Sequence, residues 1–406
     1  MVNTLETVSP LAEIAEEIEK AGGEAFKFCY QCGKCDVVCP WNRVTKFSIR
    51  RIVRQAALGL PEIELDDIWR CTTCGSCPQR CPRGVEQIDV GIAIRRVASE
   101  YEVFAGAAKT LPAVGASLVN HGNPMGEERS TRSDWADGLA IKPFSEGMEI
   151  LYFVGCYYSH DPRNMKVAKA TAKILQKAGV DFGILGSAES CCGESIRKTG
   201  NEEAFKTLAR ENIKAFIDNG VKRILVSSPH CYHTFKNEYS EFMMKLEVVH
   251  ISEYLAELVE AGRLELAGEF GKKVTYHDPC YLGRHNGVFD QPRELLRGLG
   301  GVELVEMSDT REKSLCCGGG GGRIWMHTDK EERFGDIRLA QAKEAGAEVL
   351  VTSCPYCISN FEESRLALLD QETSAGDGAT PSGETLQIKD LTEVILESLE
   401  AREETP

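Results

Sequence analysis

Two stretches of the sequence, GVKRILVSSPHC at residues 220–231 and GAEVLVTSCPYC at residues 346–357, are two copies of one unit. The second copy begins 126 residues after the first, and the cysteines around both copies repeat at intervals of 124, 125 and 126 residues. The cysteines related in this way are Cys156 and Cys280, Cys191 and Cys316, and Cys231 and Cys357. A period kept at several separate positions indicates a tandem duplication.

The residues of each copy predict alternating strands and helices. In the first copy, Ile150–Val154 and Phe182–Leu185 are short apolar runs typical of buried strands. Between them, Met165–Ala178 has helical periodicity and ends before Gly179. Strands that alternate with helices form a mostly parallel sheet with helices on its faces. Each copy is therefore predicted to be an α/β half-domain.

The expected fold class is α+α/β, with an N-terminal α-helical domain followed by two tandem α/β half-domains whose sheets are mostly parallel. Residues 120–147 contain Gly, Pro, Ser and mixed charges without sustained periodicity, which is typical of a linker. The predicted divisions are the helical domain at 1–119, the linker at 120–148, the first half-domain at 149–271 and the second half-domain at 272–406.

The overall composition narrows the class of protein. The chain has 47 Lys and Arg against 62 Asp and Glu, and the resulting formal charge of −15 disfavours sequence-independent nucleic-acid binding. No apolar run approaches the roughly 18 residues that a membrane span requires, and the first residues lack the pattern of a signal peptide. We therefore expect a cytoplasmic protein without a membrane span of its own, which a partner could hold at the inner face of the membrane.

Cysteine stands out in this composition. The chain has 17 cysteines, and an odd number does not suit a framework in which every cysteine is paired in a disulfide. Eight of them lie between residues 29 and 81, four between residues 156 and 231, and five between residues 280 and 357. In a reducing compartment, clusters of this kind indicate metal or redox chemistry.

The eight N-terminal cysteines form two boxes of one spacing, CYQCGKCDVVCP at residues 29–40 and CTTCGSCPQRCP at residues 71–82. In bacterial two-cluster ferredoxins, three thiolates spaced this closely bind one [4Fe–4S] cluster, and the fourth, before proline, binds the other cluster. A zinc ribbon also uses paired Cys-x-x-Cys, but it has no triple spacing followed by Cys-Pro. We therefore predict two cubane [4Fe–4S] clusters. One is assigned to Cys29, Cys32, Cys35 and Cys81, and the other to Cys71, Cys74, Cys77 and Cys39.

The nine remaining cysteines follow the duplication. The second copy contains Cys280, Cys316, Cys317, Cys354 and Cys357, and the first contains Cys156, Cys191, Cys192 and Cys231. They follow predicted strands, and the carboxyl ends of parallel strands face one crevice. Five thiolates that converge there exceed the number that one zinc ion or one ordinary cubane requires.

Together these motifs resemble those of the D-type subunit of heterodisulfide reductase and its homologues, and the resemblance covers nearly the whole chain. A single cysteine, a Cys-Cys-Gly triplet and a closing Cys-x-x-Cys define the cysteine-rich CCG domain, and this chain has two such modules, of which the second is complete. Three further stretches match closely, WRCTTC at 69–74, CPRGV at 81–85 and HDPCYLGRHN at 277–286.

The resemblance implies an iron–sulfur oxidoreductase subunit active in thiol/disulfide redox chemistry. In this family a complete CCG module binds a non-cubane [4Fe–4S] cluster, and ferredoxin cubanes deliver electrons to it one at a time. By resemblance, Cys280, Cys316, Cys317, Cys354 and Cys357 bind this cluster and form the catalytic centre. Since no flavin, nicotinamide or haem motif stands out, we expect a partner redox subunit, either a flavoprotein or a membrane cytochrome b-type subunit. A thiol or disulfide is the expected substrate.

The first module departs from this pattern at Ser228, which stands where the repeat has Cys354. A serine oxygen is a poorer ligand for iron than a thiolate. The four thiols of the first module can hold an ordinary cubane, a modified non-cubane cluster or a zinc ion, or can be without metal. These alternatives stay open on the sequence alone.

Two other functions share this layout of motifs. One is an electron conduit in a membrane-bound quinone-linked complex or an electron-bifurcating complex, where homologues with one degenerate CCG module occur. The other is the iron–sulfur subunit of a flavin-linked glycolate, lactate or glycerol-phosphate oxidoreductase. A zinc-based interaction module is disfavoured by the ferredoxin spacing.

Four histidines flank the cysteines of the two modules. They are His230, His233, His277 and His285. Each could protonate a leaving thiolate near neutral pH, because the ordinary pKa of histidine lies in that range. The alternative for each is a packing or helix-capping role.

Overall fold

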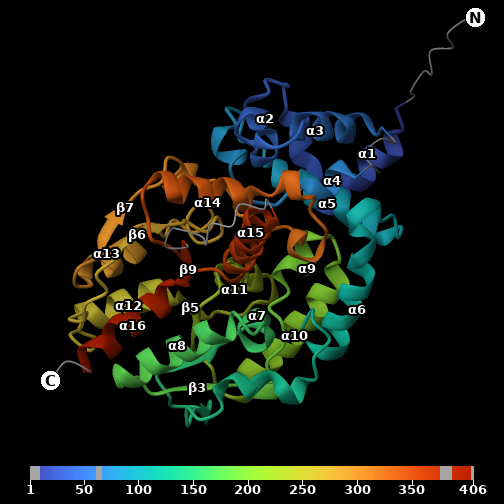
Figure 1. Ribbon diagram of the computed structural model, residues 1–406. Coiled ribbons are helices and arrows are strands. Elements are labelled where there is room, and N and C mark those ends of the chain that lie inside the picture. The colour runs from blue at the N-terminus through green and yellow to red at the C-terminus, as the bar shows by residue number, and fades with distance from the viewer. Residues whose placement is uncertain (1–9, 61–65, 375–385, 404–406) are drawn as a thin grey trace, which may run out of the picture. The chain divides into compact units, whose positions relative to one another are not determined.

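The computed structural model describes residues 10–60, 66–374 and 386–403 (Figure 1). These residues fold into two compact units. The first contains residues up to Pro112 together with Ser195–Glu202 and Gly320–Glu332, and the second contains Ala113–Glu194, Glu203–Gly319 and the residues from Arg333 onward. None of the helices in the described residues combines the length and the apolar composition that crossing a membrane requires.

The first unit is helical. Its helices include α1 (Ala12–Ile18), α2 (Lys34–Val38), α3 (Ile49–Leu58), α4 (Asp67–Arg70) and α5 (Gln87–Glu100). Helix α5 is buried along most of its length and packs against α1 and α3. Helix α3 begins after Ser48, whose side chain accepts a hydrogen bond from Arg51 N, and its buried positions recur every three to four residues. The predicted helical character of the N-terminal domain is therefore confirmed.

The second unit contains two parallel sheets. The strands of the first sheet, in spatial order, are β1 (Lys142–Pro143), β3 (Phe182–Ile184), β2 (Ile150–Phe153), β4 (Arg223–Val226) and β5 (Glu247–His250). Those of the second sheet are β7 (Glu303–Val305), β6 (Lys273–Tyr276), β8 (Val349–Thr352) and β9 (Gln387–Asp390). Every pairing between these strands is parallel, so the predicted fold class is confirmed.

The two sheets have the same strand order apart from the edge strand β1. The order β3-β2-β4-β5 of the first module corresponds to β7-β6-β8-β9 of the second, as a duplication requires. The first module contains the helices α8 (Met165–Lys177), α10 (Glu202–Asp218) and α12 (Ile251–Glu260), and the second contains α13 (Gln291–Gly298), α14 (Phe334–Glu344), α15 (Pro355–Ser374) and α16 (Leu391–Glu403). Strands β2 and β8 are buried at every residue, which explains why they read as unbroken apolar runs.

Residues 120–148, predicted to be a linker, contain regular structure. The 3₁₀-helix η7 (Arg129–Ala136) buries Trp135, whose ring lies edge-on to that of Tyr152 with 6.0 Å between centroids. Strand β1 extends the first sheet by pairing with β3. This segment packs as part of the first module, and the contacts that hold it are too distant in sequence to show as a local pattern.

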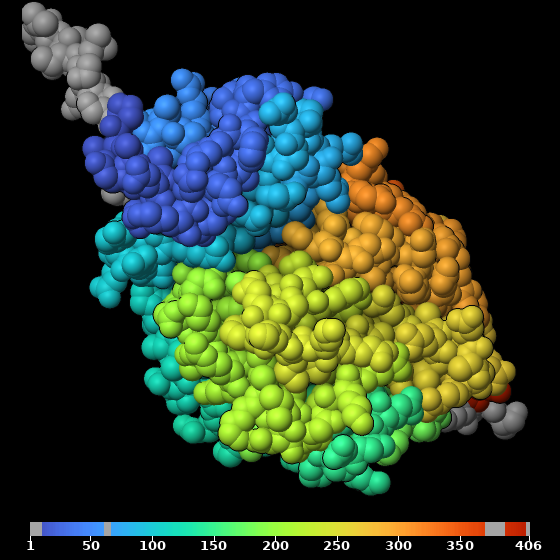
Figure 2. All heavy atoms as spheres, turned by 180° about the vertical axis from the view of Figure 1, so that it is seen from behind, coloured from blue at the N-terminus to red at the C-terminus, as the bar shows by residue number. Residues whose placement is uncertain are grey.

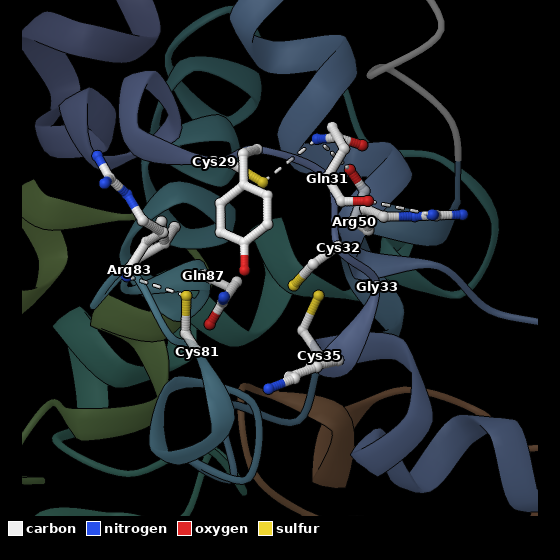
Figure 3. Close-up of a pocket in the computed structure, with 12 residues that line it drawn as sticks. Cys29, Gln31, Cys32, Gly33, Cys35, Arg50, Cys81, Arg83 and Gln87 are labelled. Carbon is white, nitrogen blue, oxygen red and sulfur yellow. Dashed lines mark hydrogen bonds between the residues drawn. The ribbon is translucent and has the colours of Figure 1, made fainter.

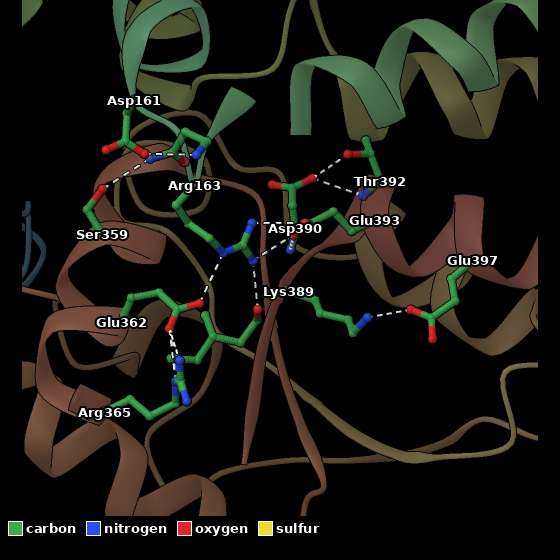
Figure 4. A network of polar contacts seen from close by, with 12 residues as sticks. Asp161, Arg163, Ser359, Glu362, Arg365, Lys389, Asp390, Thr392, Glu393 and Glu397 are labelled. Atoms are coloured by element: carbon green, nitrogen blue, oxygen red, sulfur yellow. Dashed lines mark hydrogen bonds and ion pairs between the residues drawn. The ribbon is translucent and has the colours of Figure 1, made fainter. Parts of the chain in front are cut away.

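The two modules share one hydrophobic core, which includes residues of β2 and β8. Arg163, just before α8, joins them further by donating to Glu362 of α15 at 3.0 Å and to Glu393 of α16 at 2.9 Å (Figure 4). Its guanidinium also donates to the carbonyl oxygen of Ile388 at 2.7 Å. On the face drawn in Figure 2, the green atoms of the first module adjoin the amber atoms of the second. The modules therefore pack as one body with two sheets.

Candidate metal centres

Four N-terminal thiols line one cavity of the first unit. They are Cys29, Cys32, Cys35 and Cys81 (Figure 3). The fourth thiol comes from the second box, which is the arrangement that two-cluster ferredoxins use. Gln31 Nε2 donates to Cys29 Sγ at 3.3 Å, and Val85 N donates to Cys81 Sγ at 3.2 Å. Donors of this kind fit thiolates that hold an iron–sulfur cluster.

The loops of the two boxes have the same backbone conformation. Gln31 and Thr73 occupy equivalent positions and have φ of 66° and 51°, and the glycines two residues later, Gly33 and Gly75, both have φ of 79°. A left-handed conformation at a residue other than glycine costs about 1 kcal/mol or more, and it persists where the surroundings impose it. The repeated strain indicates that both loops are shaped for the same kind of ligand. The cysteine spacing alone did not reveal the role of Gln31 and Thr73.

The other four N-terminal thiols influence one another electrostatically. Burial raises the pKa of Cys77 well above its ordinary value, and the nearby thiols Cys71 and Cys74 raise it further. Burial also raises the pKa of Cys39, which lies near the same two thiols. Neighbouring thiolates repel one another, so these four thiols can be deprotonated together only when a positive charge is bound among them. The iron ions of an iron–sulfur cluster provide that charge. Among the described residues, no three Cys, His, Asp or Glu side chains surround a point that a single metal ion would occupy.

The five cysteines of the second module, Cys280, Cys316, Cys317, Cys354 and Cys357, are buried. Cys280 follows β6, and the adjacent pair lies in the loop before α14. Cys354 lies between β8 and α15, and Cys357 lies in the first turn of α15. Sulfur hydrogen bonds link Cys317 to Cys316 and Cys357, and Cys357 to Cys354. The amide of Gly318 donates to Cys316 Sγ at 3.3 Å from a backbone with φ of 103°, which glycine adopts readily. Four thiols are thus linked in one chain of contacts that runs from Cys316 through Cys317 and Cys357 to Cys354.

The four cysteines of the first module, Cys156, Cys191, Cys192 and Cys231, are also buried. Cys156 Sγ lies 3.7 Å from Cys191 Sγ, and sulfur hydrogen bonds connect the other two thiols to this pair. Ser228 precedes α11 (Pro229–His233) and is 6% exposed, in the position that Cys354 occupies before α15. The first module keeps the arrangement but presents a hydroxyl where the second module presents a thiol.

A buried ion pair beside the first module was not visible in the sequence. Arg132 Nη2 lies 2.7 Å from Glu189 Oε1, and both side chains are almost fully buried. Glu189 also accepts hydrogen bonds from the backbone amides of Val154 and Gly155, so it fixes the turn that leads into Cys156. The Arg132 guanidinium is close enough to the Cys156 thiol to interact with its charge. Because 57 residues separate the two partners, no local pattern marks the pair.

The histidines that flank cysteines have different environments. His277 accepts a hydrogen bond at Nδ1 from Arg338 Nε, 3.2 Å away. Burial and the Arg338 charge hold the pKa of His277 well below its ordinary value, so this imidazole is neutral and unsuited to donating a proton. His233 and His285 are partly exposed, with 5.3 Å between ring centroids.

His230 is the histidine best placed to act on a cysteine, because its buried side chain forms a hydrogen bond with the Cys354 sulfur. Burial lowers the pKa of His230, but the Glu194 carboxylate and the Cys354 thiol outweigh this and raise it to about 10. The sequence pointed to His230 as a neighbour of Cys231 in the first module. The structure places it against a cysteine of the second.

Comparisons with known proteins agree with this architecture. Residues 25–85 match the 4Fe-4S dicluster domain family, and residues 150–236 and 274–362 each match the cysteine-rich domain family. The D-type subunit of dihydromethanophenazine:CoB–CoM heterodisulfide reductase from Methanosarcina mazei is 32% identical over 373 residues, which cover 84% of this chain and 89% of that relative. The corresponding subunit of Methanosarcina barkeri is 31% identical and is covered over 78% of its length.

Two bacterial relatives are longer than this chain. The probable iron-sulfur-binding oxidoreductase FadF of Bacillus subtilis is 38% identical over 347 residues, and the EtfAB:quinone oxidoreductase of Syntrophomonas wolfei is 35% identical over 350 residues. Each match covers 82% of this chain, and the chain spans about half the length of these relatives, 47% in each case. A crystal structure of a hypothetical protein from Helicobacter pylori has a TM-score of 0.54 at 11% identity, covering 94% of this chain and 72% of that one, and shows a shared fold.

Proposed function

Because this chain belongs to the family of iron–sulfur oxidoreductase subunits that includes the D-type subunit of heterodisulfide reductase, we propose that it carries single electrons through two cubane [4Fe–4S] clusters to a non-cubane [4Fe–4S] cluster in the second CCG module. The observation that carries the proposal is the position of Cys81, which joins three thiols of the other box around one cavity. Such interleaving is expected of two neighbouring cubanes.

The residues of the chain would bind the clusters and keep water away from them. Cys29, Cys32, Cys35 and Cys81 hold one cubane, Cys71, Cys74, Cys77 and Cys39 hold the other, and Cys280, Cys316, Cys317, Cys354 and Cys357 hold the non-cubane cluster. When bound, these clusters supply one-electron redox chemistry. The five thiols of the second module are at most 7% exposed, so their charge is compensated by the metal and nearby donors rather than by water.

A disulfide is the proposed substrate of the second module. Its S–S bond breaks as it takes up two electrons, supplied one at a time by a partner redox protein, and two protons complete the two product thiols. The name of the Methanosarcina relatives supports this class of reaction, and the complete set of five thiols supports its location. The proposed partner is a flavoprotein or a membrane cytochrome b-type subunit.

The second candidate function is an electron conduit without a disulfide substrate. Ser228 favours it, because a reaction that needs two equivalent CCG clusters would lack one of them here. The similarity to an EtfAB:quinone oxidoreductase, at 35% identity, favours it as well. In a conduit, electrons would leave the second module for a further redox partner rather than for a disulfide.

Anaerobic purification followed by iron, sulfide and zinc analysis tests both candidates. Three [4Fe–4S] clusters predict about 12 iron atoms per chain, and a chain with zinc and no iron would contradict any role in electron transfer. A paramagnetic signal that appears when the oxidised protein meets a thiol supports disulfide chemistry. Full iron content without such a signal, across a panel of thiols, supports the conduit.

A further inference from the structure

Four rings meet at the boundary between the two modules. Tyr157 and Tyr281 each follow the first cysteine of their module, and His230 and Tyr356 each precede the last cysteine. The centroid distance is 4.7 Å for Tyr157 and Tyr356 and 4.4 Å for His230 and Tyr281. The duplication relates these two pairs to each other. His230 and Tyr356, which occupy equivalent positions, also contact one another, with ring centroids 4.3 Å apart and ring planes tilted by 41°.

Through these rings each module reaches the cysteines of the other. The His230 side chain of the first module forms a hydrogen bond with the Cys354 sulfur of the second. Burial raises the pKa of Tyr356, and the neighbouring Tyr157 and Cys156 raise it further, so Tyr356 lies near the thiols of the first module. His230 and Tyr356 therefore occupy equivalent positions, and each reaches the other module. Their chemistry differs, because His230 is an imidazole and Tyr356 is a phenol.

A buried carboxylate orients the imidazole. His230 Nδ1 lies 2.9 Å from Glu194 Oε2, and the two side chains are 6% and 1% exposed. With Nδ1 held by the carboxylate, Nε2 is the ring nitrogen left to donate to Cys354. Glu194 directly follows the Cys-Cys-Gly triplet, where the second module has Gly319. The first module thus has a Glu and a His in place of the Gly and the Tyr of the second, and this pair acts on the site of the second module.

We propose that His230, oriented by Glu194, is a positioning residue for the second-module cluster and raises its reduction potential by donating a hydrogen bond to the Cys354 sulfur. The inference rests on the proposed function, since it requires a cluster at the second module. The reduced cluster carries one more negative charge than the oxidised cluster, and a donor to a ligand sulfur stabilises that charge. The first module has Ser228 in place of a fifth thiol. In this proposal it nevertheless contributes to the second site, through the hydrogen bond from His230.

A redox titration of the full chain tests the inference, with the paramagnetic signal of the second-module cluster as the readout. That signal is identified by its loss in Cys354→Ser, and iron content is measured on every sample. His230→Phe keeps an aromatic ring at this position but removes the hydrogen-bond donor. We therefore expect the midpoint potential of the second-module cluster to shift to a more negative value. His230→Gln restores an N–H donor and is expected to recover part of the shift.

His233→Phe is the matched control. It makes the same substitution on the same short helix, but the two ring nitrogens of His233 face Asn237, at 3.0 Å, and Glu238, at 3.5 Å. Its midpoint potential is expected to equal that of the wild type.

A His230→Phe protein with full iron content and the wild-type midpoint would overturn the inference. If His230→Phe loses iron, the midpoint potential of Glu194→Gln is measured instead. This variant keeps the imidazole and removes only its charged partner. A smaller shift in the same direction supports the inference, and an unchanged midpoint overturns it. A wild-type chain without iron would instead overturn the proposed function, so the two failures are distinguishable.

Discussion

The two CCG modules share a strand order and a cysteine spacing, but their sites differ at three equivalent positions. The first module has Glu194, Ser228 and His230 where the second has Gly319, Cys354 and Tyr356. Of these residues, His230 and Tyr356 lie at the boundary between the modules, with 4.3 Å between ring centroids, and Glu194 contacts His230. The second module has the full set of five thiols, and the first contributes His230, which contacts Cys354 of that set. The duplicated unit is therefore better understood as one composite site than as two independent ones.

The largest expected effect concerns a feature that the modules share, a buried arginine–carboxylate pair near the first cysteine. The N···O distance is 2.7 Å for Arg132 and Glu189 and 2.6 Å for Arg293 and Asp278. Arg132→Met and Arg293→Met each leave a buried carboxylate unpaired, so we expect each to lower the free energy of unfolding by about 3–5 kcal/mol. Denaturant-induced unfolding of the two variants and the wild type measures this.

Arg293 also binds Glu306, at 2.6 Å, so its variant should be the less stable of the two. If Arg132→Met were instead the less stable variant, the ion pair with Glu306 would not add to the stability that Arg293 provides through Asp278.

The next prediction tests the difference between Cys354 of the second module and Ser228 of the first. Cys354→Ser gives the second module the serine of the first. Since groups outside the ligand set already change activity by about 10- to 100-fold, we expect the loss of a ligand to lower the rate of disulfide reduction by at least about 100-fold. An anaerobic assay with a reduced dye as electron donor measures the rate. A variant that keeps more than half of the wild-type rate, with its cubane signals intact, would show that the fifth thiol is dispensable.

The converse substitution sharpens the same comparison. Ser228→Cys completes the first module, and we expect it to bind about four more iron atoms per chain if the missing thiol limits that site. Ser228→Ala serves as the matched control and should leave the iron content at the wild-type value. Equal iron content in all three proteins would mean that another residue of the first module sets its occupancy.

The smallest effect comes from a partly exposed ion pair of the first module. The hydrogen bond from Arg263, 2.8 Å from Glu149 Oε1, lowers the pKa of that carboxyl. A lowered pKa in the folded state means that the pair stabilises the protein at neutral pH and that this contribution is lost as the pH falls through the lowered pKa. Because solvent screens the pair, we expect Arg263→Gln to cost less than about 1 kcal/mol at pH 7.

Unfolding measured in low salt and in 1 M salt checks this estimate. A cost that does not shrink in high salt would point to lost packing by the arginine stem instead.

The sequence predicted much of the fold because the relevant signals are local. The apolar run Ile150–Val154 became β2, and the periodic stretch Met165–Ala178 became α8, each within about a residue of the predicted bounds. Parallel strands buried on both faces leave little ambiguity in such a pattern. The cysteine spacing likewise predicted which thiols line the cavity around Cys81.

The features that the sequence did not reveal depend on contacts between distant residues. Arg132 meets Glu189 across 57 residues, and His230 meets Cys354 across the module boundary. Segment 120–148 appeared to be a linker because its buried Trp135 has no periodic neighbours. The hydrogen bond from Arg338 to the ring of His277, which makes this histidine unsuited to donating a proton, joins residues 61 positions apart. A duplicated sequence shows which features the two copies share. The contacts between the copies become visible only in the three-dimensional structure.

The most direct test of the central claim is the iron and acid-labile sulfide content of the wild type and of Cys354→Ser, both purified anaerobically. The claim is that a complete set of five thiols makes the second module a cluster site. It predicts about 12 iron atoms per chain in the wild type and about 8 in the variant, with the spectra of both cubanes unchanged. An unchanged iron content in Cys354→Ser, or a wild type with only about 8 iron atoms, would contradict it.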